Sequence, residues 1–392
     1  MRLDWNHHFH LRLFDTRELG ALSIMLAIIY FGEGLVNIFV PIYFWKLGFP
    51  IWKILGFYLL NSVYFLIFAG LLIPVIKRMS DKFMIALSVP FLIVYFLLLN
   101  SIDAHNYLFW IAPALLALNM LFLNVGYTVD FTYAIRKGRE GHEVGMRYLT
   151  GALSQFLAPL FGGFIIAIFG FHISFFVAIA IFFISVIPLF FVPRREVGNQ
   201  IHIRGLFLFF EEKYRAFNIA SMGVASELMV GRVLWPIFMF LALQSFEELG
   251  GIVSLGMLLG ALGTYIVGSF FDKGRARGTL ISLSSIFSLV WFSRVFLRGV
   301  NLISGSHIVG NIVNSGLMVA WASEYYSRAR DSESPIMFVL SREILYQVVR
   351  IFFLPVLMVL SLFIPLEFFF PICFAIAGFL TILFSFAAEK KI

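Results

Sequence analysis

The hydrophobic pattern of the chain consists of twelve long apolar runs separated by short polar or charged connections. A helix needs about 20 mostly apolar residues to cross a bilayer. In lipid a helix satisfies its backbone hydrogen bonds within one segment, and the runs lack the alternation of a membrane β-barrel. The pattern therefore predicts an all-α integral membrane protein with spans at 19–45, 54–76, 83–100, 107–133, 148–169, 171–193, 216–243, 250–271, 279–297, 300–323, 336–363 and 367–388.

Composition narrows the function classes. The 392 residues are 61% hydrophobic and 13% charged, whereas about 25% charged residues is usual for a soluble protein. The sequence contains no phosphate-binding glycine loop, no nucleophile elbow and no metal-ligand spacing of His and Cys. We therefore expect no enzyme, no cofactor, no metal and no nucleic-acid partner, and transport driven by an ion gradient or by the gradient of the substrate.

Lysine and arginine fix the predicted orientation. If the amino terminus is cytoplasmic, 23 of the 29 Lys and Arg residues lie on the cytoplasmic side, and Arg232 and Arg350 lie within spans. Positively charged connections are retained in the cytoplasm, so both termini are predicted there, in the plasma (inner) membrane. Four residues fall on the opposite side: Lys46, Lys53, Arg294 and Arg298.

An internal repeat divides the chain into two halves. Glu33 and Glu227 are 194 residues apart, and the Pro-Ile steps beginning at Pro41 and Pro236 are 195 apart. Similar offsets relate other uncommon membrane residues, as in transporters built from two parallel repeats. We expect an amino-terminal six-helix bundle at 1–193, a cytoplasmic linker at 194–213 and a carboxy-terminal six-helix bundle at 214–392.

The connection between the eighth and ninth runs carries a family resemblance. It reads Gly-Ser-Phe-Phe-Asp-Lys-Gly-Arg-Ala-Arg-Gly from Gly268 to Gly278, and the placing of Gly268, Asp272, Lys273 and Arg275 resembles the signature loop of the major facilitator superfamily. It departs from that pattern by one missing residue before its second glycine. The resemblance implies twelve helices in two bundles, with spans 1, 4, 7 and 10 lining a cavity for a small molecule.

Charged residues at the predicted cytoplasmic ends of the spans form a candidate gate. Asp130 with Arg136 and Glu324 with Arg330 occupy equivalent places in the two halves and resemble motifs of sugar porters in this superfamily. We expect Asp130 and Glu324 each to pair with a basic residue when that side is closed; solvated, weakly paired charges are the alternative. The complete candidate set is Asp81, Asp130, Arg136, Arg147, Asp272, Lys273, Arg275, Glu324, Arg330 and Arg342.

Glu33 and Glu227 lie near the middle of predicted spans 1 and 7, Arg350 lies at similar depth in span 11, and Arg232 lies somewhat further out in span 7. A charge near the middle of a bilayer costs at least about 2.5 kcal/mol and normally faces a partner or a wet cavity. In a functional interpretation one glutamate carries a proton, and we favour Glu33. In a structural interpretation Glu227 is permanently paired with Arg350.

Polar residues of spans 1, 4, 7 and 10 are candidates for contact with substrate. His307 is expected to be a satisfied polar residue rather than a proton relay, since a single histidine makes no metal site. The candidate cavity residues are Asn37, Asn119, Asn124, Tyr127, His307, Asn311 and Asn314.

These features predict a monomeric secondary transporter that works by alternating access. Pro159-x-x-Gly162-Gly163 in span 5 resembles the antiporter signature of the superfamily, although close helix packing explains the small residues equally well. We slightly favour proton-coupled export of small amphipathic molecules. The alternatives are uptake of a polar or anionic metabolite held by Arg232 or Arg350, and a membrane scaffold or sensor that transports nothing.

Overall fold

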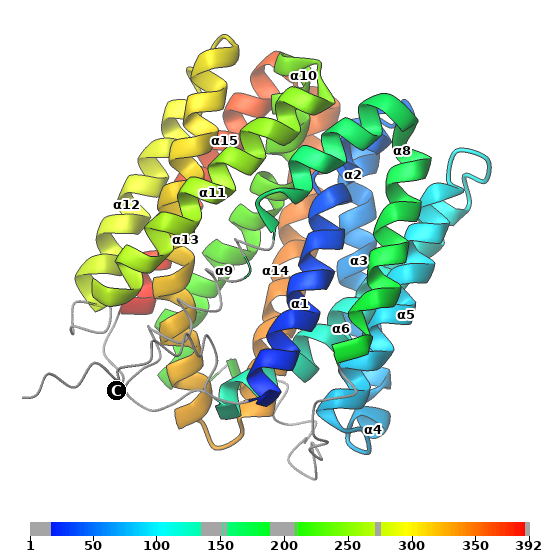
Figure 1. The fold of residues 1–392 in the computed structure, drawn as a ribbon. Coiled ribbons are helices and arrows are strands. Elements are labelled where there is room, and N and C mark those ends of the chain that lie inside the picture. Colours follow the sequence, from blue (N-terminus) through cyan, green and yellow to red (C-terminus); the bar gives the residue numbers. More distant parts are fainter. Residues whose placement is uncertain are drawn as a thin grey trace, which may run out of the picture.

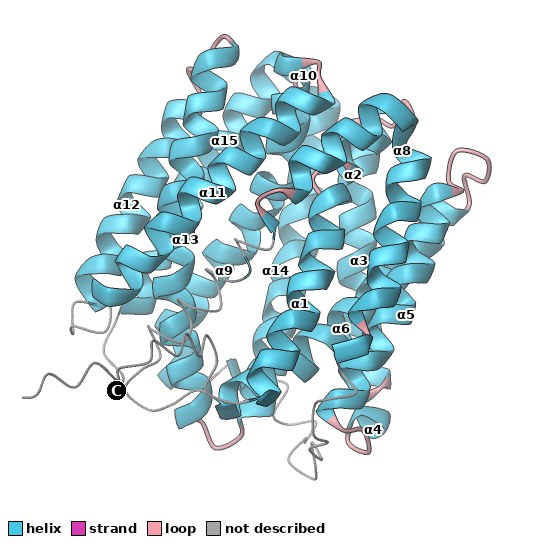
Figure 2. Cartoon of the chain, viewed as in Figure 1, coloured by secondary structure: helices cyan, strands magenta, loops and turns pink. Residues whose placement is uncertain are grey.

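The computed structural model of the chain describes residues 17–134, 151, 155–188, 208–209, 211–270 and 276–388. Every regular element in these ranges is a helix (Figure 2). The predicted linker at 194–213 lies largely outside the described residues.

The amino-terminal half contributes seven described helices that correspond to predicted spans 1 to 6. Span 1 is made of two helices, and so is span 2. The helices are α1 (Arg17–Val36), α2 (Val40–Lys46), α3 (Ile51–Leu71), α4 (Ile73–Ile76), α5 (Asp81–Asn100), α6 (Leu108–Ala134) and α8 (Ala158–Ser185).

The carboxy-terminal half contributes spans 7 to 12. Span 7 combines α-helices with a π-helical segment, and span 12 ends in a 3-10 helix. Its elements are η4 (Glu212–Tyr214), α9 (Arg215–Met229), η5 (Val230–Leu234), α10 (Trp235–Leu243), α11 (Phe246–Phe270), α12 (Ala276–Arg294), α13 (Val300–Asp331), α14 (Pro335–Phe363), α15 (Leu366–Ile382) and η7 (Leu383–Ala388).

The predicted twelve-helix architecture is confirmed. Ten helical segments in the described ranges are long and apolar enough to span a membrane. One of them, α8, holds two spans, because Gly170 breaks its helical geometry with φ 81° and ψ 175°. The chain reverses there, at the green hairpin of Figure 1, and only glycine adopts such a conformation readily. The helix α12 supplies the remaining span.

The two most extensive contacts between the halves are those of α3 with α14 and of α8 with α11. The second pair meets at the upper end in Figure 1, near the connections α2–α3 and α10–α11. A Cβ on Gly163 would lie 3.0 Å from the carbonyl carbon of Phe246, and one on Gly250 would lie 3.0 Å from that of Pro159. Glycine on both helices thus permits backbone-to-backbone contact, as the small residues of span 5 predict.

We call this contact between α8 and α11 the upper seal. The backbone N–H of Leu160 donates a hydrogen bond of 2.9 Å to Ser254 Oγ across it. Beside it the ring of Phe246 packs edge-on against Phe39 and Phe171 of the other half, with centroids 6.2 and 5.4 Å apart. The halves are therefore tightly joined at this end.

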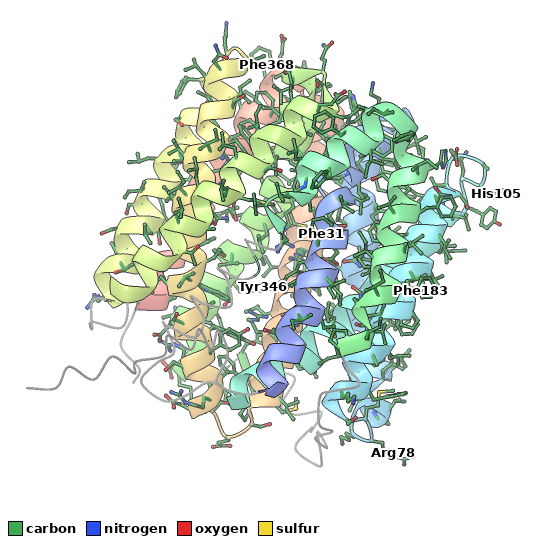
Figure 3. The ribbon with its side chains drawn as sticks, in the orientation of Figure 1. Phe31, Arg78, His105, Phe183, Tyr346 and Phe368 are labelled. Atoms are coloured by element: carbon green, nitrogen blue, oxygen red, sulfur yellow. The ribbon has the colours of Figure 1, made fainter. Side chains whose placement is uncertain are left out.

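The outer surface of the bundle is apolar. Phe183 and Phe368 are 64% and 58% exposed and lie away from the interior on α8 and α15, whereas Tyr346 lies within the bundle (Figure 3). A large exposed apolar surface of this kind fits contact with lipid. Buried charged groups inside the bundle are then the residues that need an explanation.

Candidate functional site

Spans 1 and 7 are interrupted at equivalent places. Residues 37–39 form a turn between α1 and α2, and the π-helix η5 replaces α-helix at Val230–Leu234. Pro41 and Pro236 follow these interruptions directly. Proline cannot donate the hydrogen bond that an unbroken helix requires. Both halves are therefore interrupted just before their Pro-Ile steps.

Glu33 lies on the last turn of α1, next to the first interruption. Its side chain is half-buried, and Asn37 beside it is exposed. In the described part of the chain no hydrogen bond or ion pair of the Glu33 carboxylate is found. The guanidinium of Arg232, from the π-helix of the other half, acts on it electrostatically.

Arg232 lies where the two halves face each other. Its side chain is exposed although it belongs to the middle of span 7. It acts electrostatically on Glu33 of α1 and Tyr58 of α3 in one half, and on Glu227 and Arg350 in its own half. Arg232 is thus the charge that Glu33, Glu227 and Arg350 have in common.

Glu227 has different surroundings from Glu33. It is 3% exposed, and its Oε1 accepts a hydrogen bond of 3.1 Å from Nε1 of Trp291. Arg294 is the strongest electrostatic partner of Glu227. The predicted pair between Glu227 and Arg350 is wrong, because α12 rather than α14 supplies the groups that neutralise this glutamate.

Arg294 is itself a correction. The charge count assigned Arg294 to the side of the membrane opposite the cytoplasm. In the structure its side chain is only 4% exposed. Its guanidinium lies between two indole rings, 3.9 Å from the Trp235 centroid and 4.1 Å from the Trp291 centroid. Such cation–π contacts stabilise a desolvated guanidinium. The signal in the sequence was the spacing of Trp291 and Arg294, three residues apart and therefore on one helix face.

His307 belongs to the same cluster. Trp235 Nε1 donates a hydrogen bond of 3.0 Å to His307 Nδ1, and the Asn311 amide lies 2.9 Å from Nε2. An indole N–H can only donate, so Nδ1 carries no proton and Nε2 carries the proton of a neutral ring. The Asn311 side-chain nitrogen also donates to the backbone oxygen of His307 at 3.2 Å. His307 is a satisfied polar residue, as expected.

Span 11 carries the remaining interior charges. Arg350 is 6% exposed, and its Nη1 donates to Gln347 Oε1 at 3.3 Å. Arg342 forms an ion pair with Glu343 and stacks on Tyr325, 4.0 Å from the ring centroid. Glu343 and Gln347 were missed by sequence reasoning, because nothing in a single helix shows which of its polar residues face inward.

The other predicted cavity residues divide into two groups. Asn119 Nδ2 donates to the backbone oxygen of Ser88 at 3.0 Å, which is a structural contact inside the amino-terminal half. Asn124 Nδ2 reaches Glu343 Oε2 at 3.4 Å and so connects the halves. Tyr127 is buried, and Asn314 is half-buried with an Oδ1 that has no hydrogen bond in the described structure.

The candidate gate is described in part. Glu324 pairs with Arg328, one turn along α13, with 2.7 Å between Oε1 and Nε, whereas Arg330 lies 3.9 Å from Asp331. Arg342 has Glu343 as its partner, and Arg328 was not among the predicted residues. Asp81 and Asp130 lie on helices, but their side chains are outside the described part. Arg136, Arg147, Asp272, Lys273 and Arg275 lie outside the described residues altogether.

In the described ranges no group of three or more His, Cys, Asp or Glu side chains could hold a metal ion. Among the described residues, Arg232 acts electrostatically on Glu33 in the other half and on Arg350 in its own half.

Comparison with known proteins gives the family. The model of the Major Facilitator Superfamily matches residues 22–341. Among solved structures, the human organic anion transporter MFSD10 (TETRAN) aligns with TM-score 0.70 and 10% identity over 95% of this chain and 99% of its own. The nucleoside transporter NupG aligns with TM-score 0.67 and 14% identity over 95% and 98%.

The E. coli fucose:proton symporter FucP aligns with TM-score 0.68 and 12% identity over 95% of this chain and 98% of its own. At these identities the likeness shows a shared fold. A search of curated protein sequences finds no significant match. The family match and the candidate spans support an integral, multi-pass secondary transporter rather than an enzyme. The resemblance noted in the signature loop is confirmed, and the chain belongs to the major facilitator superfamily.

Proposed function

We propose that the chain is a monomeric, proton-coupled secondary transporter that carries a small molecule between its two six-helix halves by alternating access. Glu33 is the proton carrier in this proposal, and Arg232 is the positive charge that acts on its carboxylate. The observation that carries the proposal is the contrast between the two equivalent glutamates.

Glu227 is buried, receives a hydrogen bond from Trp291 and is neutralised by Arg294. Removing its charge would leave a buried arginine unbalanced, which is costly. Glu33 is half-buried, lies beside an interrupted helix and has an exposed arginine as its electrostatic partner. A carboxylate in that position can gain and lose a proton as the halves move.

The contrast also bears on the alternative of a non-transporting scaffold. A scaffold needs its interior charges sealed in dry helix contacts, as Glu227 and Arg294 are. Glu33 and Arg232 come from opposite halves, and the Arg232 side chain is exposed, which supports transport.

The proposal covers transport in either direction, uptake or export. The glycines of span 5 have a packing role in the upper seal, so they give no reason to favour export. The structure of a protein named as a fucose:proton symporter shares the fold, and this supports proton coupling as a proposal.

The test is transport by purified protein in proteoliposomes, with a substrate found by thermal-shift screening. Glu33→Gln should abolish accumulation driven by a pH gradient while exchange of substrate at equal pH continues. Glu248→Gln, which removes an exposed carboxylate, should behave as wild type. Full gradient-driven accumulation by Glu33→Gln would show that another group couples the proton.

We further propose that both termini and the charged gate, with Glu324, Arg328 and Arg342, face the cytoplasm of a cell whose plasma membrane holds the protein. The upper seal then faces outward. A cysteine at Ser332 should react with a membrane-impermeant maleimide only after the cells are opened, and labelling in intact cells would reverse the orientation.

A further inference from the structure

The charges between the halves do not balance. Arg342 is paired with Glu343, and Arg294 is the main electrostatic partner of Glu227. Arg232, Arg350 and Glu33 remain, and none of the three has an ion pair within 4.0 Å among the described residues. Glu343 also acts on Arg350, but it is already paired with Arg342. The four arginines Arg232, Arg294, Arg342 and Arg350 thus face three carboxylates, Glu33, Glu227 and Glu343, and the guanidinium groups of Arg232 and Arg350 repel each other.

The donors around Arg350 also lack acceptors. Its Nε is buried without a hydrogen bond, and so is Nε2 of Gln347. The two residues lie three positions apart on α14, and Gln347 has already used its oxygen to accept from Arg350 Nη1. Buried donors are nearly always satisfied in native proteins, so this pair points to an acceptor that arrives from outside the chain.

We propose that the substrate is a small organic anion whose carboxylate or phosphate binds between Arg232 and Arg350, and that it is carried together with a proton. This rests on the proposed transport function and names its substrate class. Arginine binds planar carboxylate and phosphate groups through paired N–H donors. The amide of Gln347 supplies a further donor beside Arg350.

Coupling to the proton follows from Arg232. This residue is the cation that acts on Glu33. An anion bound to Arg232 competes with the Glu33 carboxylate for the same positive charge and repels it, so Glu33 takes a proton from solvent. Among the described residues, the phenol of Tyr95 interacts with Glu33, and that of Tyr58 interacts with Arg232 and Tyr95. Residues 155–171 of the neighbouring helix carry no ionisable side chain.

Anion and proton thus bind together rather than in competition. A monoanion and one proton enter as a neutral pair, and both are released when the site opens to the other side. The sequence slightly favoured exchange of substrate against protons. In such an exchange, binding of the substrate would have to release the proton rather than promote its binding.

The test is binding by the full-length protein in detergent, with benzoate, succinate and inorganic phosphate as probes and uncharged benzamide as the control. At least one anion should raise the Tm by several degrees more than benzamide. In weak buffer with a pH-indicator dye, that anion should be bound with uptake of about one proton. Glu33→Gln should still bind it, but without proton uptake.

Two substitutions locate the site. Arg350→Gln and Arg232→Gln should each weaken binding at least tenfold, whereas Arg298→Gln, an exposed arginine elsewhere, should leave it unchanged. Arg232 is exposed, so its variant tests the site even if Arg350→Gln fails to fold.

Three results would overturn the inference: no stabilisation by any of the three anions, equal binding by Arg232→Gln, or proton release on binding. All three results are measured by binding in detergent, without a gradient. If Glu33→Gln shows full gradient-driven accumulation in liposomes, the proposed coupling role of Glu33 fails independently of these results.

Discussion

The upper seal permits a sharp test of how the halves hold together. Gly250→Ala would place a methyl group 3.0 Å from the carbonyl carbon of Pro159 and 3.3 Å from Leu160 Cα, with the Pro159 oxygen nearer still. Ordinary contacts of a Cβ lie between 3.4 and 4 Å. The obstacle is backbone, which cannot turn aside as a side chain can, so α8 and α11 must separate.

The cost can be estimated. Overpacking of this kind costs about 1–3 kcal/mol, and about 1.4 kcal/mol corresponds to a factor of ten in an equilibrium constant. We therefore expect the population closed at the upper seal to fall roughly five- to 150-fold relative to open forms. Gly251→Ala is the matched control, because its Cβ would meet Leu160 Cδ1 at 3.8 Å, an ordinary contact.

The assay is maleimide labelling of a cysteine at Ser254, which is 6% exposed at the seal, in purified protein that lacks Cys373. Labelling should be at least fivefold faster with Gly250→Ala than in the parent protein, and unchanged with Gly251→Ala. Equal rates for Gly250→Ala and its parent would refute the packing argument. Equal acceleration by both variants would show that general loosening of α11 is responsible.

Two further predictions concern the buried cluster of the carboxy-terminal half. Trp291→Phe removes the hydrogen bond to Glu227 and should lower the stability by about 1.5–3 kcal/mol, measured as a reduced Tm; an unchanged Tm would show that the bond contributes nothing. His307→Gln should leave the pH dependence of transport unaltered, because the Trp235 donor holds the imidazole neutral, and a shifted pH profile would make His307 a proton carrier.

Much of the architecture could be predicted from the sequence. The apolar runs follow from the backbone requirements of a lipid environment, which act on each segment separately. The two interruptions were foreseeable because proline acts locally, at Pro41 and Pro236. The depth of Glu33, Glu227, Arg232 and Arg350 could likewise be counted along each span.

The partners of those charges could not be predicted, because they depend on how helices rotate against one another. Glu227 finds Arg294 rather than Arg350, since α12 rather than α14 presents its charged face there. Arg294 was misplaced because charge counting assigns a residue near a span end to the surface. In fact two tryptophan rings replace the water around it.

The π-helix in span 7 explains why the spacing between the central glutamate and the proline differs between the two halves. Pro41 lies eight positions after Glu33, but Pro236 lies nine positions after Glu227. A π-helical turn accommodates one additional residue inside an α-helix, and each residue of an α-helix turns the chain by about 100°. Compared with span 1, span 7 thus has one additional residue between its glutamate and its proline. This residue changes the direction in which the side chains between them point. Arg232 lies within this π-helical segment, so one additional residue in span 7 accompanies a chemical difference between the two halves at their centre.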